Sequence, residues 1–309
     1  MTATEMLHGE KIKIKQRKFM EKLISIVGLT SSGKSALGIE LAKKFNGEIV
    51  SADSRQVYIG LDWCSGKVSK EEQQVVKHHL LDVVELGTRF TLFDFQQQAY
   101  KSIDDIVSRG KVPLLVGGTG LYSRSVVEGY NLIEQKPDEN LRKNLENMTT
   151  EQLLEVCKQK NISVEGEITN RRLVRLIETA NNQKQPNKPR YKVLQIGVFW
   201  ERDEIYKRIE ERLKQRMPFM IEEIKNLLKR GIDANFLKEL GLEAKFIVDF
   251  LDGKFESYDE FFEELFKEER HFAKRQNTWY NKEQNLIWLD AKDNLFEKAS
   301  KLVQDFLAE

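Results

Sequence analysis

The chain has little of several features that mark specialised classes of protein. Only two of its 309 residues are cysteines, Cys64 and Cys157, which argues against a disulfide framework or a cysteine metal site and fits a reducing cytoplasm. No apolar run is long enough to span a membrane. The N-terminal segment 1–20 is basic but lacks the apolar core of a secretion signal, so we expect a polar extension or an extra strand there.

An excess of charge of one sign is also absent. The chain carries 50 Lys and Arg against 49 Asp and Glu, so its formal net charge is only +1 and does not by itself indicate a nucleic-acid partner. Charged residues make up 32% and apolar residues 40%, as in ordinary soluble globular proteins. The length is sufficient for one large domain or two.

A phosphate-binding loop is the clearest feature that the sequence does contain. Two glycines are spaced as G-x-x-x-x-G in "VGLTSSGKS", after the β-branched run "LISIV" and before apolar residues at helical spacing. Backbone amides of such a loop, the N-terminus of the following helix and a lysine attract phosphate, and a serine hydroxyl at its end reaches Mg²⁺. We therefore predict phosphate binding by Gly28, Ser31, Ser32, Gly33, Lys34 and Ser35, with Ser35 also the metal ligand.

Strand and helix patterns alternate in the first part of the chain. The runs "LISIV", "GEIVSADS" and "KVPLLVGGTG" have strand character, and the helical patterns "SALGIELAKKF" and "DFQQQAYKSIDDIVSRG" lie between them, the second ending at Gly110. Repeated units of this kind predict a parallel, doubly wound sheet that binds ligands at the carboxyl ends of its strands.

The later part of the chain is mainly helical. From about Lys136 to Lys192 it is polar, strand character returns in "KVLQIGVFW", helices are predicted over 203–217, 222–231 and 258–282, and a short strand "NLIWLD" follows. We predict an α/β fold with a P-loop NTPase-like parallel-sheet core over 21–135 and 193–309 and a helical C-terminal part. A helical insert over 136–192 and a polar extension over 1–20 complete the prediction.

An acid at the end of the second predicted strand favours group transfer over hydrolysis. Motor and switch ATPases need an acid at the tip of an apolar strand, but the third strand ends in glycines and threonine, Gly117 to Gly120. Asp53 instead stands where small-molecule kinases place the group that meets the acceptor, and Thr30 inside the loop can point across the same cleft. A strand-end turn or a helix cap is the alternative role for Asp53.

Five motifs in this order resemble the tRNA dimethylallyltransferase family. They are "GLTSSGKS", "SADSRQVY", "KHHLLDV", "VGGTGLY" and "FAKRQNTWY", and the resemblance covers roughly Leu23 to Lys282. It implies transfer of a dimethylallyl group from dimethylallyl diphosphate to the exocyclic N6 amine of the adenosine 3′-adjacent to the anticodon. The phosphate in the loop is then the leaving diphosphate, and Mg²⁺ is the implied cofactor.

The resemblance also implies roles for individual residues. Asp53 accepts a proton or a hydrogen bond from the adenine amine and Thr30 helps to orient that amine, while Arg216 in "KQRMPFM" adds a cation to the diphosphate. Thr119 matches a position that lines the cleft and is expected to contact the diphosphate. Departures from the family pattern at Cys64–Val68, Met217–Met220, Leu242 and Glu269 touch the substrate clamp but leave Thr30, Lys34, Ser35 and Asp53 intact.

A tRNA anticodon stem-loop is the partner that the resemblance implies, with no membrane and no obligate protein partner. Segment 171–192 of the insert holds seven Lys and Arg against one Glu. A cation-and-aromatic cluster follows in "HFAKRQNTWY", and base contacts are expected beside the acid. The predicted RNA contacts are Gln56, Tyr58, Arg171, Arg172, Lys274, Arg275, Gln276 and Trp279, with packing inside the protein as the alternative for Gln56, Tyr58 and Trp279.

Three other functions remain open at this stage. An adenylate isopentenyltransferase acting on free AMP, ADP or ATP would share the loop, the acid and the donor, but would not need the basic insert. A P-loop small-molecule kinase would consume ATP, and a non-catalytic nucleotide- or RNA-binding adaptor would not need Asp53. Adjacent His78 and His79 on one strand face opposite ways, which argues against joint metal binding.

Overall fold

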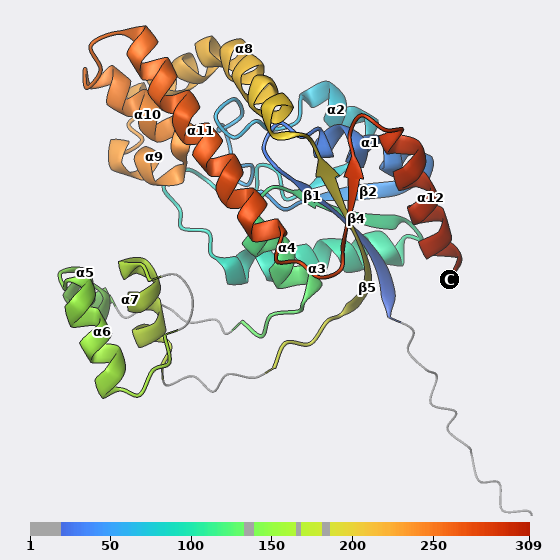
Figure 1. The fold of residues 1–309 in the computed structure, drawn as a ribbon, viewed down its shortest axis with the longest axis horizontal. Coiled ribbons are helices and arrows are strands. Elements are labelled where there is room, and N and C mark those ends of the chain that lie inside the picture. The colour runs from blue at the N-terminus through green and yellow to red at the C-terminus, as the bar shows by residue number, and fades with distance from the viewer. Residues whose placement is uncertain (1–19, 133–138, 165–167, 181–185) are drawn as a thin grey trace, which may run out of the picture.

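The computed structural model describes residues 20–132, 139–164, 168–180 and 186–309 (Figure 1). Its centre is a six-stranded sheet with the order β3-β2-β4-β1-β5-β6, and every pair of neighbouring strands is parallel. The predicted parallel sheet is thereby confirmed. The strands are β1 (Glu21–Gly28), β2 (Gly47–Ser51), β3 (His78–His79), β4 (Val112–Gly117), β5 (Tyr191–Phe199) and β6 (Leu286–Asp290).

Helices cover both faces of this sheet, which is why its central strands are apolar throughout rather than alternating. On one face, Ile24 and Ile26 of β1 pack with α1 (Lys34–Lys44) and α12 (Leu295–Ala308). On the other face, Leu23 packs with α3 (Leu92–Ser108) and α4 (Gly120–Val127). The sheet is thus held rigidly between two layers, and its carboxyl edge can carry a precise site.

The helical C-terminal part forms a second core beside the sheet. It consists of α8 (Arg202–Lys229), α9 (Ala234–Leu240), α10 (Leu242–Leu251) and α11 (Tyr258–Tyr280), which pack on the segment after β2 (Figure 1). The prediction of two helices over 203–217 and 222–231 is wrong, because α8 runs through Pro218. Its buried stripe continues on both sides of the proline, so packing outweighs the one lost backbone hydrogen bond.

Three short helices follow α4 and lie apart from the sheet (Figure 1). They are α5 (Glu139–Glu146), α6 (Thr150–Gln159) and α7 (Asn170–Glu178), within the range predicted as an insert. Leu153, Cys157 and Leu173 are among the residues of their own small core. The predicted insert ended at 192, whereas β5 already begins at Tyr191.

Two further features complete the described part of the chain. The short helix α2 (Lys70–Val75) precedes β3 and has a capping box at Ser69. None of the described helices is long and apolar enough to cross a membrane. The predicted N-terminal extension over 1–20 lies outside the described residues except for Met20.

A buried carboxylate of β2 joins the edge strand β3 to the end of α3 and to the residue before β4. Glu48 is 2% exposed and accepts two hydrogen bonds of 2.6 Å from the Arg109 guanidinium. Lys111 and His79 complete its partners at 2.8 Å each. The hydrogen bonds from Arg109 are the largest cause that holds the pKa of Glu48 far below its usual range, despite burial.

We predict that Glu48→Gln lowers the free energy of unfolding by about 2 kcal/mol at pH 7, because Arg109, Lys111 and His79 lose the buried anion to which they bond. Since the folded pKa is depressed, the Glu48 contribution is complete above its unfolded pKa of about 4.3 and is lost as the pH falls. Urea unfolding of both proteins at pH 7 and pH 3 measures this. A difference that does not shrink at pH 3 would contradict the assignment.

Candidate functional site

The loop between β1 and α1 has the backbone of an anion cradle. Gly33 stands at φ 89°, a left-handed conformation that glycine adopts without strain, and Ser31 also has a positive φ of 60°. A turn closes where the Ser32 amide donates to the Leu29 carbonyl at 3.2 Å. Helix α1 begins at Lys34, so the loop ends at the positive end of a helix dipole.

Side chains of the C-terminal part fix this loop from outside. Trp200 Nε1 donates to the Ser32 carbonyl at 2.8 Å, and Arg208 Nε donates to the Ser31 carbonyl at 2.9 Å. The Arg208 guanidinium also lies over the Trp200 ring, 4.3 Å from its centroid. Two loop carbonyls are therefore turned towards these donors, which keeps the cradle in one conformation.

Gln276 joins the loop to the end of β4. Its Oε1 accepts a hydrogen bond of 2.8 Å from the Thr30 amide, and its Nε2 donates to the Gly118 carbonyl at 2.9 Å. The residue is 8% exposed. Both ends of the Gln276 amide thus bond the protein backbone, and its contact with RNA stays a prediction.

Asp53 follows β2 on the same edge of the sheet. Its Oδ1 accepts from the Arg55 amide at 2.9 Å, and the neighbouring Ser54 amide donates to Thr119 Oγ1 at 3.1 Å. The turn after β4 comes so close that a Cβ on Gly117 would lie 2.2 Å from the Ala52 carbonyl oxygen. Glycine at 117 is therefore needed to bring Asp53 and Thr119 together.

Two neighbouring pairs of cations near the cradle repel each other, Arg212 with Lys34 and Arg216 with Arg212. Burial of the charged end lowers the pKa of Lys34 to about 8, and the charge of Arg212 lowers it further while Asp53 opposes the change. Burial likewise lowers the pKa of Arg212 to about 10, with Arg216 as the next cause. Within the described residues, no salt bridge joins Lys34, Arg212 or Arg216 to a carboxylate.

The charge of Arg212, and not that of Arg216, contributes to the lowered pKa of the loop lysine, Lys34. The sequence predicts Arg216 as the added cation, but Arg216 Nη2 donates to the Trp63 carbonyl and its charge is not a cause of the Lys34 shift. Arg212, one turn earlier, acts on Lys34 and is itself influenced by Asp53. Arg208, Arg212 and Arg216 are four residues apart and thus share a helix face, a signal that sequence reasoning missed.

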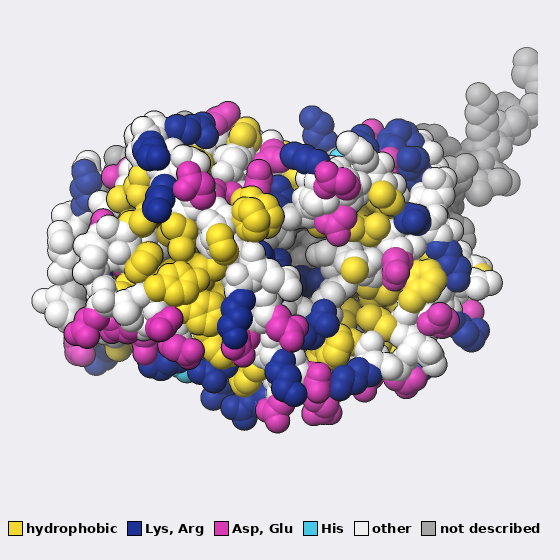
Figure 2. Space-filling view, turned by 90° about the horizontal axis from the view of Figure 1, so that it is seen from above, with side chains coloured by type: hydrophobic (Ala, Val, Ile, Leu, Met, Phe, Trp, Pro, Cys, Tyr) yellow, Lys and Arg dark blue, Asp and Glu magenta, His cyan; other side chains and the backbone are white. Residues whose placement is uncertain are grey.

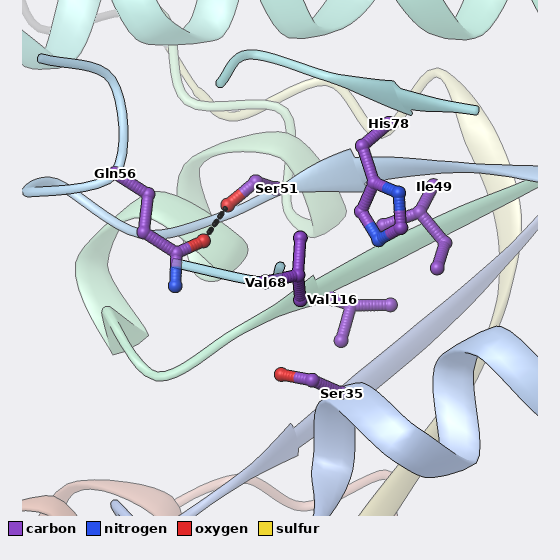
Figure 3. A pocket seen from close by; sticks show the side chains of 7 residues that line it. All are labelled: Ser35, Ile49, Ser51, Gln56, Val68, His78 and Val116. Carbon is purple, nitrogen blue, oxygen red and sulfur yellow. Dashed lines mark hydrogen bonds between the residues drawn. The ribbon is translucent and has the colours of Figure 1, made fainter. Parts of the chain in front are cut away.

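A small recess lies beside the cradle (Figure 3). Ser35 and His78 line it together with Gln56, whose side chain turns towards Ser51. Ser51 Oγ donates to Gln56 Oε1 at 2.9 Å and Gln56 Nε2 donates to the Gly66 carbonyl at 3.3 Å. Gln56 thus lies inside the site, while His79 contacts Glu48, so the two histidines face different groups as predicted.

The other predicted RNA contacts divide into packed and exposed residues. Tyr58 is 7% exposed, donates to the Thr88 carbonyl at 3.3 Å and packs edge-on against Phe236, so it takes the packing alternative. Trp279 is half-buried against Gly120 and lies under Arg124, 4.8 Å from ring centroid to guanidinium. The exposed residues are Arg171, Arg172, Lys274 and Arg275.

Known proteins of one family are similar to this chain. A family model described as IPP transferase matches residues 56–283. The chain is 38% identical to tRNA dimethylallyltransferase 2 of Shewanella sediminis, over 92% of this chain and 98% of that one. It is 36% identical to tRNA dimethylallyltransferase of Oceanobacillus iheyensis, over 93% of this chain and 97% of the relative.

Solved structures share the fold. A tRNA isopentenylpyrophosphate transferase from Bacillus halodurans superposes with a TM-score of 0.71 at 35% identity, covering 93% of this chain and 96% of the other. A eukaryotic dimethylallyltransferase acting on tRNA superposes with a TM-score of 0.77, covering 93% and 80%, and its 23% identity makes this a likeness of fold.

The cation cluster predicts an affinity for diphosphate that depends on pH. Because the pKa of Lys34 is lowered to about 8, Lys34 loses its proton above that pH, and an anion bound beside it restores the charge. Inorganic diphosphate should therefore bind more weakly as the pH rises from 7.5 to 9, with proton uptake in calorimetry. Lys34→Arg stays charged over this pH range, so its diphosphate affinity should lack the part of the pH dependence that comes from Lys34. An identical pH dependence in both proteins would argue against titration of Lys34.

Proposed function

This chain belongs to the IPP transferase family, and from that premise we propose that it transfers a dimethylallyl group from dimethylallyl diphosphate to tRNA. The acceptor is the exocyclic N6 amine of the adenosine 3′-adjacent to the anticodon. In this reaction the allylic C–O bond of the donor breaks, a C–N bond forms, the amine gives up one proton and diphosphate leaves.

The observation that carries the proposal is the set of cations beside the glycine loop. Burial lowers the pKa of Lys34 to about 8 and that of Arg212 to about 10, and repulsion from a neighbouring arginine lowers each further, from Arg212 at Lys34 and from Arg216 at Arg212. A polyanion relieves this repulsion, and a leaving diphosphate gains negative charge as the C–O bond breaks. Preorganised cations and loop amides therefore stabilise the transition state more than the ground state.

Asp53 is the group that we assign to the acceptor amine. Its charge acts on both Lys34 and Arg212, so the carboxylate and the cradle share one site at the carboxyl edge of the sheet. A carboxylate there accepts a hydrogen bond or the proton from N6 and makes the nitrogen a better nucleophile. Thr30, whose amide is fixed by Gln276, and Thr119, bonded to the Ser54 amide, flank this position.

The residues present also fit Mg²⁺ as a cofactor. Among the described residues no group of three His, Cys, Asp or Glu side chains could hold a metal, so a Mg²⁺ ion here would take phosphate oxygens and water as its other ligands. Ser35 lines the recess next to the cradle and is the hydroxyl that would bind the ion. When bound, Mg²⁺ would neutralise charge on the diphosphate.

Exposed cations on two separate elements support tRNA as the acceptor. Arg171 and Arg172 lie in the first turn of α7, and Lys274 and Arg275 lie on α11. Exposed Lys and Arg of this kind bind RNA phosphates and position the stem-loop. An adenylate isopentenyltransferase or a small-molecule kinase would need neither pair of cations. The two relatives described above are both named tRNA dimethylallyltransferase.

We predict that Asp53→Asn lowers the rate of prenyl transfer by about 10²–10⁴-fold, because the amide cannot take the proton. Transfer of label from dimethylallyl diphosphate to unmodified tRNA measures the rate, and filter binding measures tRNA affinity, which should stay unchanged. Parallel reactions with AMP and with ATP test the alternatives. Label in AMP alone, or ATP consumption without label in tRNA, would replace the proposed function.

Removal of the predicted metal ligand should raise the Mg²⁺ requirement. Ser35→Ala should increase the Mg²⁺ concentration for half-maximal activity by about tenfold or more, and EDTA should abolish transfer by the wild-type protein. Ser108→Ala, at the exposed end of α3, is the matched control and should behave as wild type. Full activity in EDTA would contradict the role assigned to Mg²⁺.

A further inference from the structure

A loop beside the cradle, Asp62–Lys67, is fixed by a single carboxylate of α8. Glu223 Oε1 accepts from the amides of Asp62 and Trp63 at 2.6 and 2.8 Å. Its Oε2 accepts from the Cys64 amide at 2.8 Å. Three consecutive backbone amides thus converge on one side chain, an arrangement that suits a full negative charge.

The carbonyls of the same loop hold the arginines of the site. The Trp63 carbonyl accepts from Arg216 Nη2, and the Gly66 carbonyl accepts from Arg212 Nη2 at 3.4 Å. The Gly66 carbonyl also accepts from Gln56 Nε2 at 3.3 Å. Glu223 and the two arginines all project from α8. One helix therefore supplies both the carboxylate that accepts from the loop amides and the guanidinium groups that donate to the loop carbonyls.

Further contacts leave the loop little freedom elsewhere. The Trp63 ring stacks on Phe219 with centroids 4.3 Å apart and an interplanar angle of 16°. Lys67 has a side chain only 2% exposed and pairs with Asp62 at 2.6 Å and Asp82 at 2.5 Å. This lysine therefore supports the loop.

The loop and the two arginines line one open cavity of about 490 Å³. In Figure 2 the upper face of the molecule is hollowed near its centre, with Lys and Arg side chains at the hollow. Arg212 lines this cavity, and its charge contributes to the lowered pKa of Lys34, so the cavity adjoins the cradle. A shift of the loop changes the positions of both guanidinium groups at once.

We propose that Glu223 is a positioning residue for the diphosphate of the donor. It fixes the amides of residues 62–64, the loop then fixes the carbonyls of Trp63 and Gly66, and these carbonyls hold Arg216 and Arg212 against their mutual repulsion. The inference rests on the proposed function, and it adds a residue that itself touches neither substrate. Without the carboxylate, three amides lose their acceptor and the arginines lose a defined place.

The test compares Glu223→Gln with Glu222→Gln, an exposed neighbour on the same helix. Glutamine keeps the size of the side chain but offers one acceptor oxygen and an amide group that repels backbone N–H groups. We expect Glu223→Gln to raise the KM for dimethylallyl diphosphate by about tenfold to a hundredfold, as a misplaced positioning group does. The KM for tRNA should stay within twofold, and Glu222→Gln should match wild type.

A purely structural role would act differently. Glu223→Asp retains the charge and should recover part of the donor affinity, while loss of fold would lower the unfolding midpoint and raise both KM values together. An unchanged donor KM in folded Glu223→Gln, or equal increases for donor and tRNA, would overturn the inference. Calorimetry with inorganic diphosphate tests the role of Glu223 even if the wild-type protein transfers no prenyl group and the proposed function fails. Weaker diphosphate binding by Glu223→Gln than by the wild type would support that role. Equal binding by the two proteins would refute it.

Discussion

The repulsion among cations that share one buried site is the interaction on which the rest of this structure depends. Two like charges a few ångströms apart, with partly removed solvent, cost several kcal/mol unless an anion neutralises them. Burial lowers the pKa of both Lys34 and Arg212, and repulsion from Arg212 at Lys34 and from Arg216 at Arg212 lowers it further. The surrounding protein provides hydrogen bonds that keep these groups in place until a polyanion arrives.

Those supports come from parts of the chain that are far apart in sequence. Trp200 and Arg208 hold the cradle from the start of the C-terminal part, and Gln276 holds it from α11. Asp53 reaches the same edge because Gly117 allows the strand ends to approach. The parallel sheet makes this possible, since the carboxyl ends of its strands and the N-terminus of α1 meet along one side.

The sequence predicted the features that depend on local pattern. The strand, loop and helix around Gly33 have a periodicity and a glycine spacing that few other structures share, and Asp53 follows its strand directly. It could not show which arginine faces the cradle, because Arg208, Arg212 and Arg216 share one helix face and only the packing of α8 on the sheet distinguishes them. The break predicted between residues 217 and 222 is wrong for the same reason, because tertiary packing decides whether a helix continues through Pro218. The two backbone hydrogen bonds of Gln276 likewise depend on tertiary contacts and not on local pattern.

A crystal structure with Mg²⁺ and a thiolo analogue of dimethylallyl diphosphate, which reacts slowly, would test the central claim most directly. We expect the diphosphate to lie in the Gly28–Ser35 loop within hydrogen-bond distance of Lys34 and Arg212, with the allylic carbon directed towards Asp53. A diphosphate bound elsewhere, or an allyl group directed away from the Asp53 carboxylate, would contradict it.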